Sequence, residues 1–144
     1  MSARLLSVHM GPGKTDSWGT PRAVYQALDA EFNFSLDPCP LEGSQDGLAA
    51  LFLPWAGHRV FCNPPYGPQI RRWLERATEA EVAVYLIPAR TDTRWFHEIV
   101  LPRASEIRFL RGRLRFGDAK AGAPFPSMVV VFRNSPCNPG TVAG

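Results

Sequence analysis

The chain has 144 residues, of which 45% are hydrophobic and 11% aromatic, which suits one packed domain and excludes a disordered chain. Its 3 cysteines share no C-x-x-C spacing and no long apolar run is present, so we expect no disulfide framework, no metal, no membrane and a cytoplasmic protein. Residues 1–56 carry 3 Lys and Arg against 6 Asp and Glu, whereas residues 90–144 carry 9 against 4, which favours a polyanionic partner.

The first predicted elements are a helix and a short strand. Thr20-Pro21 is typical of a helix start, with a hydroxyl cap followed by proline in the first turn, and apolar spacing continues the helix to about Glu31. The run Phe32–Leu36 favours a strand that must stop at Asp37, because two prolines follow within three residues. Asp37 is therefore predicted at the carboxyl end of a strand.

The middle of the chain predicts a strand, a loop, a helix and a strand. Arg59–Cys62 is β-prone and is broken by the segment Asn63–Gly67. Apolar residues at helical spacing then run from Ile70 to Ala77. The continuous apolar run Val82–Ile87, which Pro88 ends, is typical of a strand covered on both faces.

A further helix and strand follow. Thr91 or Asp92 can cap a helix whose apolar stripe, Trp95–Val100, ends before Pro102. The segment Ser105–Leu110 then returns as a strand.

The last part of the chain completes the expected domain plan. Gly112 favours a turn, and Met128–Phe132 is a buried strand. We expect a flexible leader at 1–17, one domain at 18–134 and a disordered tail at 135–144. Short strands alternating with amphipathic helices predict an α/β layer structure with a mainly parallel sheet, whose ligands bind at the carboxyl ends of the strands.

The strongest chemical signal is Asn63-Pro64-Pro65-Tyr66. The prolines stiffen the loop and remove two backbone donors, which leaves the Pro64 carbonyl and the Asn63 amide oxygen as acceptors for an amino group. Accepting both hydrogens of an adenine amine makes its lone pair available and stabilises the cation that develops on attack. The Tyr66 ring suits stacking on a base flipped out of a duplex. The alternative is a rigid turn without chemistry.

An ordered set of segments resembles one family. These segments are Trp18-Gly19-Thr20-Pro21, Leu36-Asp37-Pro38-Cys39, Phe61 to Gly67 with Trp73, Leu86 to Thr93 with Trp95-Phe96, Gly112 to Phe116, and Pro126-Ser127. Together the chain resembles the small phage-type DNA N6-adenine methyltransferases, often called Dam-like.

The resemblance implies a compact Rossmann-like fold that binds S-adenosylmethionine and acts on double-stranded DNA. It implies that Trp18, Thr20, Pro21 and the segment Asp37-Pro38-Cys39 hold the cofactor. The stretch from Asp37 to Gly57 is too short for the two strand–helix units of a full methyltransferase, so the fold is expected to be shortened before the Asn63 strand. A ribose-binding carboxylate would come from Asp46, which we prefer to Glu42.

Other interpretations of these side chains remain open. Asp37 also suits a local turn in which its carboxylate accepts a backbone N–H. Five arginines are predicted to contact DNA phosphates, and three of them would share one face of an extended segment. A solvated face without a ligand is the alternative. The five are Arg90, Arg94, Arg111, Arg113 and Arg115.

The function predicted is methyl transfer from S-adenosylmethionine to the N6 amino group of adenine in DNA. Two rivals stay open. The same loop is similar to loops that methylate an RNA adenine or a protein glutamine, whose amide also presents an NH2 group. The second alternative is a non-catalytic, nucleic-acid-binding remnant of the fold that has lost its affinity for the cofactor. It stays open because no G-x-G-x-x-G motif is present.

Overall fold

The computed structural model describes residues 19–39, 53–115 and 122–134. The predicted leader and tail lie outside the described residues, and so do Trp18, Glu42 and Asp46.

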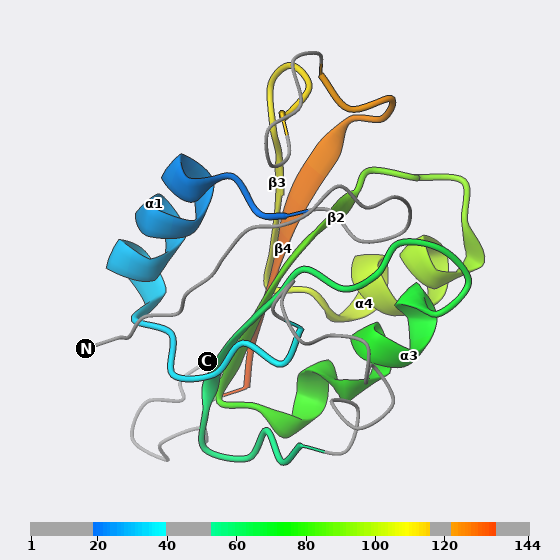
Figure 1. The fold of residues 1–144 in the computed structure, drawn as a ribbon. Coiled ribbons are helices and arrows are strands. Elements are labelled where there is room, and N and C mark those ends of the chain that lie inside the picture. Colours follow the sequence, from blue (N-terminus) through cyan, green and yellow to red (C-terminus); the bar gives the residue numbers. More distant parts are fainter. Residues whose placement is uncertain (1–18, 40–52, 116–121, 135–144) are drawn as a thin grey trace.

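Four strands form one sheet at the centre of the molecule (Figure 1). The strands are β1 (Arg59–Cys62), β2 (Val82–Pro88), β3 (Glu106–Phe109) and β4 (Ser127–Arg133), in the order β1-β2-β4-β3. The β1–β2 pair is parallel, and β4 runs antiparallel to both β2 and β3. Leu36 adds a parallel bridge to Val60 on the outer side of β1.

The expectation of a mainly parallel sheet was wrong, since one of these three strand pairs is parallel and two are antiparallel. The reason lies in the connection between β3 and β4. A parallel pair needs a crossover, usually a helix, on one face of the sheet. The chain after β3 instead turns at Gly112, whose φ is 75°, and returns beside β3 as a hairpin.

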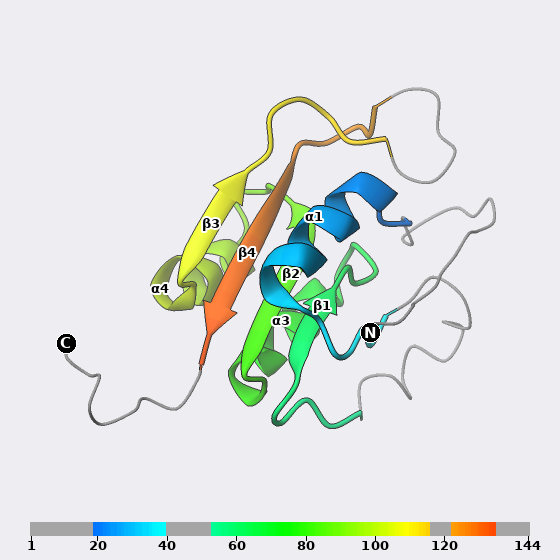
Figure 2. The ribbon, with the colours of Figure 1, turned by 90° about the vertical axis from the view of Figure 1, so that its left-hand side faces the viewer.

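Helices cover both faces of the sheet (Figures 1 and 2). One face carries α1 (Arg22–Phe32), and the other carries α3 (Ile70–Glu75) and α4 (Leu101–Arg103). Alternation along the strands explains this division. The Phe61 ring meets Tyr25 of α1 at 5.1 Å between centroids, whereas the Tyr85 hydroxyl donates to the Trp73 carbonyl of α3 at 2.6 Å.

The first helix and the strand after it differ from the prediction at their ends. The helix α1 has Pro21 at its N-cap and no side-chain cap hydrogen bond, so the expected Thr20 cap is not formed. At the other end Asn33 takes a left-handed conformation with φ 55°, which ends the helix. The predicted strand 32–36 therefore shrinks to the single bridge at Leu36.

The later elements follow the prediction more closely. The strands β1 and β2 match, and α3 continues as a 3-10 turn, η2 (Arg76–Glu79). The following helix starts differently, because Phe96 N–H donates to the hydroxyl of Thr93 and not to Thr91 or Asp92. It also passes through Pro102, since a π-helical turn, η3 (Phe96–Val100), leads into α4 with proline in its first turn.

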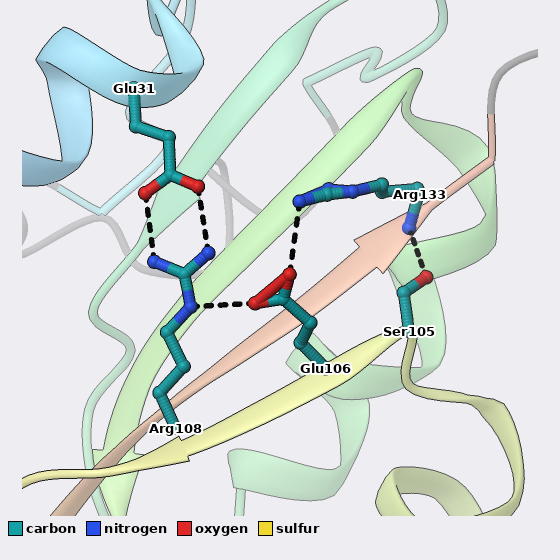
Figure 3. Close-up of polar contacts among 5 residues, drawn as sticks. All are labelled: Glu31, Ser105, Glu106, Arg108 and Arg133. Carbon is teal, nitrogen blue, oxygen red and sulfur yellow. Dashed lines mark hydrogen bonds and ion pairs between the residues drawn. The ribbon is translucent and has the colours of Figure 1, made fainter.

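An ion-pair network ties α1 to the edge strand (Figure 3). Arg108 of β3 donates to both carboxylate oxygens of Glu31 at 2.8 and 2.7 Å, and to Glu106 at 2.6 Å. Glu106 also pairs with Arg133 of β4 at 3.2 Å. Hydrogen bonding to Arg108 is the main cause that lowers the pKa of Glu31 and of Glu106. The last turn of α1 is thereby fixed against the sheet.

Candidate active site

The two predicted polar segments meet at the carboxyl edge of the sheet. The strand β1 runs directly into Asn63, and the parallel bridge of Leu36 to Val60 places the next residues beside it. Burial, a hydrogen bond with the Cys39 thiol and the nearby Asp37 carboxyl together raise the pKa of Cys62 well above its usual range. The residues after Leu36 thus lie next to the start of the Asn63 loop, as expected.

Asn63 is half-buried, and its side chain is hydrogen-bonded to a residue far away in the sequence. Its Nδ2 donates to Oγ1 of Thr20 at 2.9 Å. Pro64 is buried and Pro65 is half-buried, so the loop is packed and not a solvated turn. The hydrogen bond joins Thr20, which the resemblance implies for cofactor binding, to Asn63, which is predicted to bind the target amine.

Tyr66 lies in the core, with 6% of its surface exposed. Its hydroxyl donates to the Leu86 carbonyl at 3.2 Å, and its ring meets the edge of Phe125 at 5.4 Å between centroids. Burial raises the pKa of Tyr66, so the phenol stays protonated. The Tyr66 ring therefore packs against Phe125. A base flipped out of a duplex would stack on Tyr66 only by entering the space beside these two rings.

Phe125 was not predicted from the sequence, and Ser127 was named only within the Pro126-Ser127 segment of the resemblance, without a role in the site. Phe125 is buried, with the Arg90 guanidinium 5.6 Å from its ring centroid. Ser127 opens β4 opposite Pro88, and among the described residues its buried hydroxyl has no hydrogen-bond partner. Their position in the sequence could have indicated them, because both flank Pro126 at the start of the buried strand β4.

Asp37 has a carboxyl group whose environment disfavours its charge. Burial is the main cause that raises its pKa to about 7, against an opposing hydrogen bond from the Cys39 N–H at 3.0 Å. That bond is the local turn named as an alternative, so the turn is formed. No basic side chain in the described part of the chain forms a salt bridge with Asp37.

The other residues implied for the cofactor border the same edge. Pro38 is buried and Cys39 half-buried beside Asp37. Pro21 is half-buried at the start of α1, where its carbonyl accepts the Tyr25 N–H at 3.0 Å. S-adenosylmethionine carries an ammonium and a sulfonium charge, and the Asp37 carboxyl without a cationic partner among the described residues fits such a ligand.

All five predicted DNA-contacting arginines are exposed. Arg94 pairs with Glu98 at 3.5 Å and is 87% exposed. Arg113 donates to the Ala123 carbonyl at 3.2 Å, and its side chain lies against Gly122, where an added Cβ would approach to 2.7 Å. The positive φ of Gly112 interrupts the regular extended backbone on which the predicted shared face of Arg111, Arg113 and Arg115 depended.

In 19–39, 53–115 and 122–134, no three His, Cys, Asp or Glu side chains gather as ligands of a metal ion would. Of the helices in those ranges, none has the length and apolarity to cross a bilayer.

Comparison with known proteins places the chain in a family. Residues 9–138 match the family model described as DNA N-6-adenine-methyltransferase (Dam). Comparisons with curated proteins and with solved structures found no match. The family match covers the Asn63 loop, the Asp37 segment and the Arg113 hairpin alike. The chain therefore belongs to the DNA N-6-adenine-methyltransferase (Dam) family.

Proposed function

We propose that this protein transfers a methyl group from S-adenosylmethionine to the N6 amino group of adenine in DNA, with Asn63-Pro64-Pro65-Tyr66 as its catalytic loop. The observation that carries the proposal is the placement of this loop at the carboxyl end of β1, beside Asp37 and with Asn63 anchored to Thr20. Membership of the family supplies the reaction at family level.

In the proposed reaction the loop acts as an acceptor for the amine. The Asn63 amide oxygen and the Pro64 carbonyl accept its two N–H hydrogens and direct its lone pair at the methyl group. When bound, the cofactor supplies a methyl group that its sulfonium charge activates. The Asp37 carboxyl would bind the cationic part of the cofactor, and the packed prolines keep the two acceptors in place.

DNA would approach the same edge of the sheet. Arg90 lies over Phe125, which contacts the ring of Tyr66, so a cationic side chain stands next to the base-binding loop. Arg111, Arg113 and Arg115 follow the end of β3 on the same side of the molecule, where guanidinium groups can bind phosphate oxygens.

The decisive experiment is transfer of labelled methyl from S-adenosylmethionine to unmethylated duplex DNA, followed by nucleoside analysis. We expect the label in N6-methyladenine. Label on RNA or on a peptide glutamine but not on DNA would overturn the acceptor. Absence of both transfer and cofactor binding would overturn the enzyme assignment and favour the remnant.

Asn63→Ala should lower kcat by about 100 to 1000-fold, because it removes one preorganised acceptor of the developing charge. The measurement is single-turnover methyl transfer to DNA. Gln69→Ala is the matched control, since Gln69 is an exposed carboxamide six positions further on that makes no cap hydrogen bond to α3. Near wild-type activity of Asn63→Ala would refute the catalytic role of the loop.

A further inference from the structure

We propose that Thr20 is a positioning residue for Asn63, whose amide it holds in the orientation that accepts the target amine. The resemblance assigned Thr20 to the cofactor, whereas the structure joins its hydroxyl to the catalytic loop. This inference rests on the proposed function.

The Thr20–Asn63 contact is a side-chain hydrogen bond between segments 43 residues apart, at 2.9 Å and partly shielded from solvent. Nδ2 of the amide donates and the threonine oxygen accepts. Because the carboxamide is planar, binding its nitrogen on one side places its oxygen on the other. In the bonded arrangement observed, the amide oxygen is therefore turned away from Thr20.

The hydroxyl of Thr20 has no role in capping the helix that follows. The helix α1 starts after Pro21, and no side chain caps it. A hydroxyl next to a helix start ordinarily binds a backbone N–H of the first turn. Here that oxygen binds Asn63, which indicates that its position serves the loop.

The helix α1, which begins two residues after Thr20, is held at both ends. At its far end, Glu31 is bound by both Nη atoms of Arg108 at 2.7 and 2.8 Å (Figure 3). At its near end, the Tyr25 ring packs on Phe61 of β1, two residues before Asn63. These contacts hold α1 in place, so the distance from Thr20 to the Asn63 loop is determined by the packing of the helix on the sheet.

Orientation of the amide matters because the two ends differ in hydrogen-bonding sense. With its oxygen toward the amine, Asn63 accepts a hydrogen; if the amide were rotated by half a turn, an N–H would face the N–H of the substrate. The rotated form would be non-productive. Without the bond to Thr20 the carboxamide is less restrained, and it spends more time in this and other non-productive orientations. A change at Thr20 should therefore lower kcat without weakening ligand binding.

The test compares Thr20→Val, which keeps the branched shape but loses the acceptor, with Thr20→Ser, which keeps the hydroxyl. We expect Thr20→Val to lower kcat by about 10-fold. KM for DNA and the affinity for S-adenosylhomocysteine, measured by calorimetry, should change by less than about 2-fold. Thr20→Ser should restore most of the rate.

A second readout does not depend on turnover. In nitrogen-15 spectra, the Asn63 side-chain amide signals, assigned by their loss in Asn63→Ala, should shift in Thr20→Val and stay near wild type in Thr20→Ser. Unshifted signals in Thr20→Val would overturn the hydrogen bond in solution.

The outcomes separate this inference from the proposed function. If the wild-type protein transfers no methyl group, the proposed function fails, whatever the amide signals report. If the wild type is active and Thr20→Val keeps full kcat, the positioning role is overturned. If the affinity for S-adenosylhomocysteine falls as far as the rate, Thr20 holds the cofactor instead, and the inference is again overturned.

Discussion

The polar side chains around the Asn63 loop take their partners from distant parts of the chain. Asn63 binds Thr20 across 43 residues, and the Tyr66 hydroxyl binds the Leu86 carbonyl across 20. The residue types of the loop indicate their chemistry, because carboxamide and carbonyl oxygens are acceptors wherever they lie. Their orientation depends on contacts that no local spacing encodes.

Ser127→Ala should raise the free energy of unfolding by about 1 kcal/mol, because a buried hydroxyl without a partner carries an uncompensated desolvation cost. Urea unfolding measures the change. Ser105→Ala is the matched control and should lower stability, since the Ser105 hydroxyl accepts the Arg133 N–H at 2.9 Å. A clear loss of stability in Ser127→Ala would mean that Ser127 has a partner in solution.

Asp37→Asn should stabilise the protein at pH 8, because it removes a carboxylate charge that burial disfavours. The partial solvent contact of this side chain keeps the gain to on the order of 2 kcal/mol. The folded-state pKa of about 7 lies above the ordinary 3.8, so the folded protein binds the proton more tightly. Wild-type stability must then fall as pH rises from about 4 to above 7. Denaturant unfolding across this range checks the slope, which Asp37→Asn should remove.

The same substitution should weaken cofactor binding, because it removes the negative charge that would bind a cation. Calorimetry with S-adenosylmethionine at pH 8 measures this loss. A variant that is both more stable and still binds the cofactor as wild type would place the cofactor elsewhere.

At the scale of elements, the helix α1 is held to the sheet by ion pairs at its last turn and by aromatic packing along its inner face. Tyr25 and Phe32 of α1 both contact Phe34, which follows the helix. The Arg108 and Arg133 guanidinium groups lie 5.5 and 5.4 Å from the Phe32 ring centroid. The ion-pair network of Glu31, Arg108, Glu106 and Arg133 is therefore combined with ring contacts, and it joins α1, the helix that follows Thr20, to the edge strand β3.

Arg108→Met should lower the melting temperature at pH 7 and flatten its acid-side decline. Glu31 and Glu106 have pKa values lowered from 4.5 by Arg108, so their stabilisation is present above about pH 4.5 and is lost as pH falls through their folded-state values. Arg94→Met is the control, because the exposed Arg94–Glu98 pair should contribute almost nothing. An equal change of melting temperature in the two variants would contradict a stabilising role for the ion pairs of Arg108 with Glu31 and Glu106.

At the scale of the whole molecule, the exposed Arg111 and Arg115 follow β3, which runs in the same direction as β2, so they lie at the edge that holds the Asn63 loop. Arg111→Gln and Arg115→Gln should each reduce the salt dependence of DNA binding, by about 0.9 in the slope of log K against log salt concentration per phosphate contact. Fluorescence anisotropy with duplex DNA at several salt concentrations measures the slope. Arg103→Gln, at an exposed site before the opposite end of β3, should leave it unchanged.

The sequence by itself determined the local features of this protein. Apolar runs and prolines located β1, β2 and β4 to within about two residues, and helical spacing located α1 and α3. These signals are local because a strand or helix buries a face that its own spacing defines. The residues of the Asn63 loop, and the segments that carry the family resemblance, were equally visible, and the family match confirms the resemblance.

Only the tertiary structure decided which segments pair and which side chains meet. The position of β4 between β2 and β3, the binding of Thr20 to Asn63 in place of a helix cap, and the packing of Tyr66 on Phe125 all join residues far apart in the chain. Each follows from a choice between partners that a local pattern leaves equivalent. A hydroxyl can bind a helix end or a distant amide, and burial in the completed fold selects one of them.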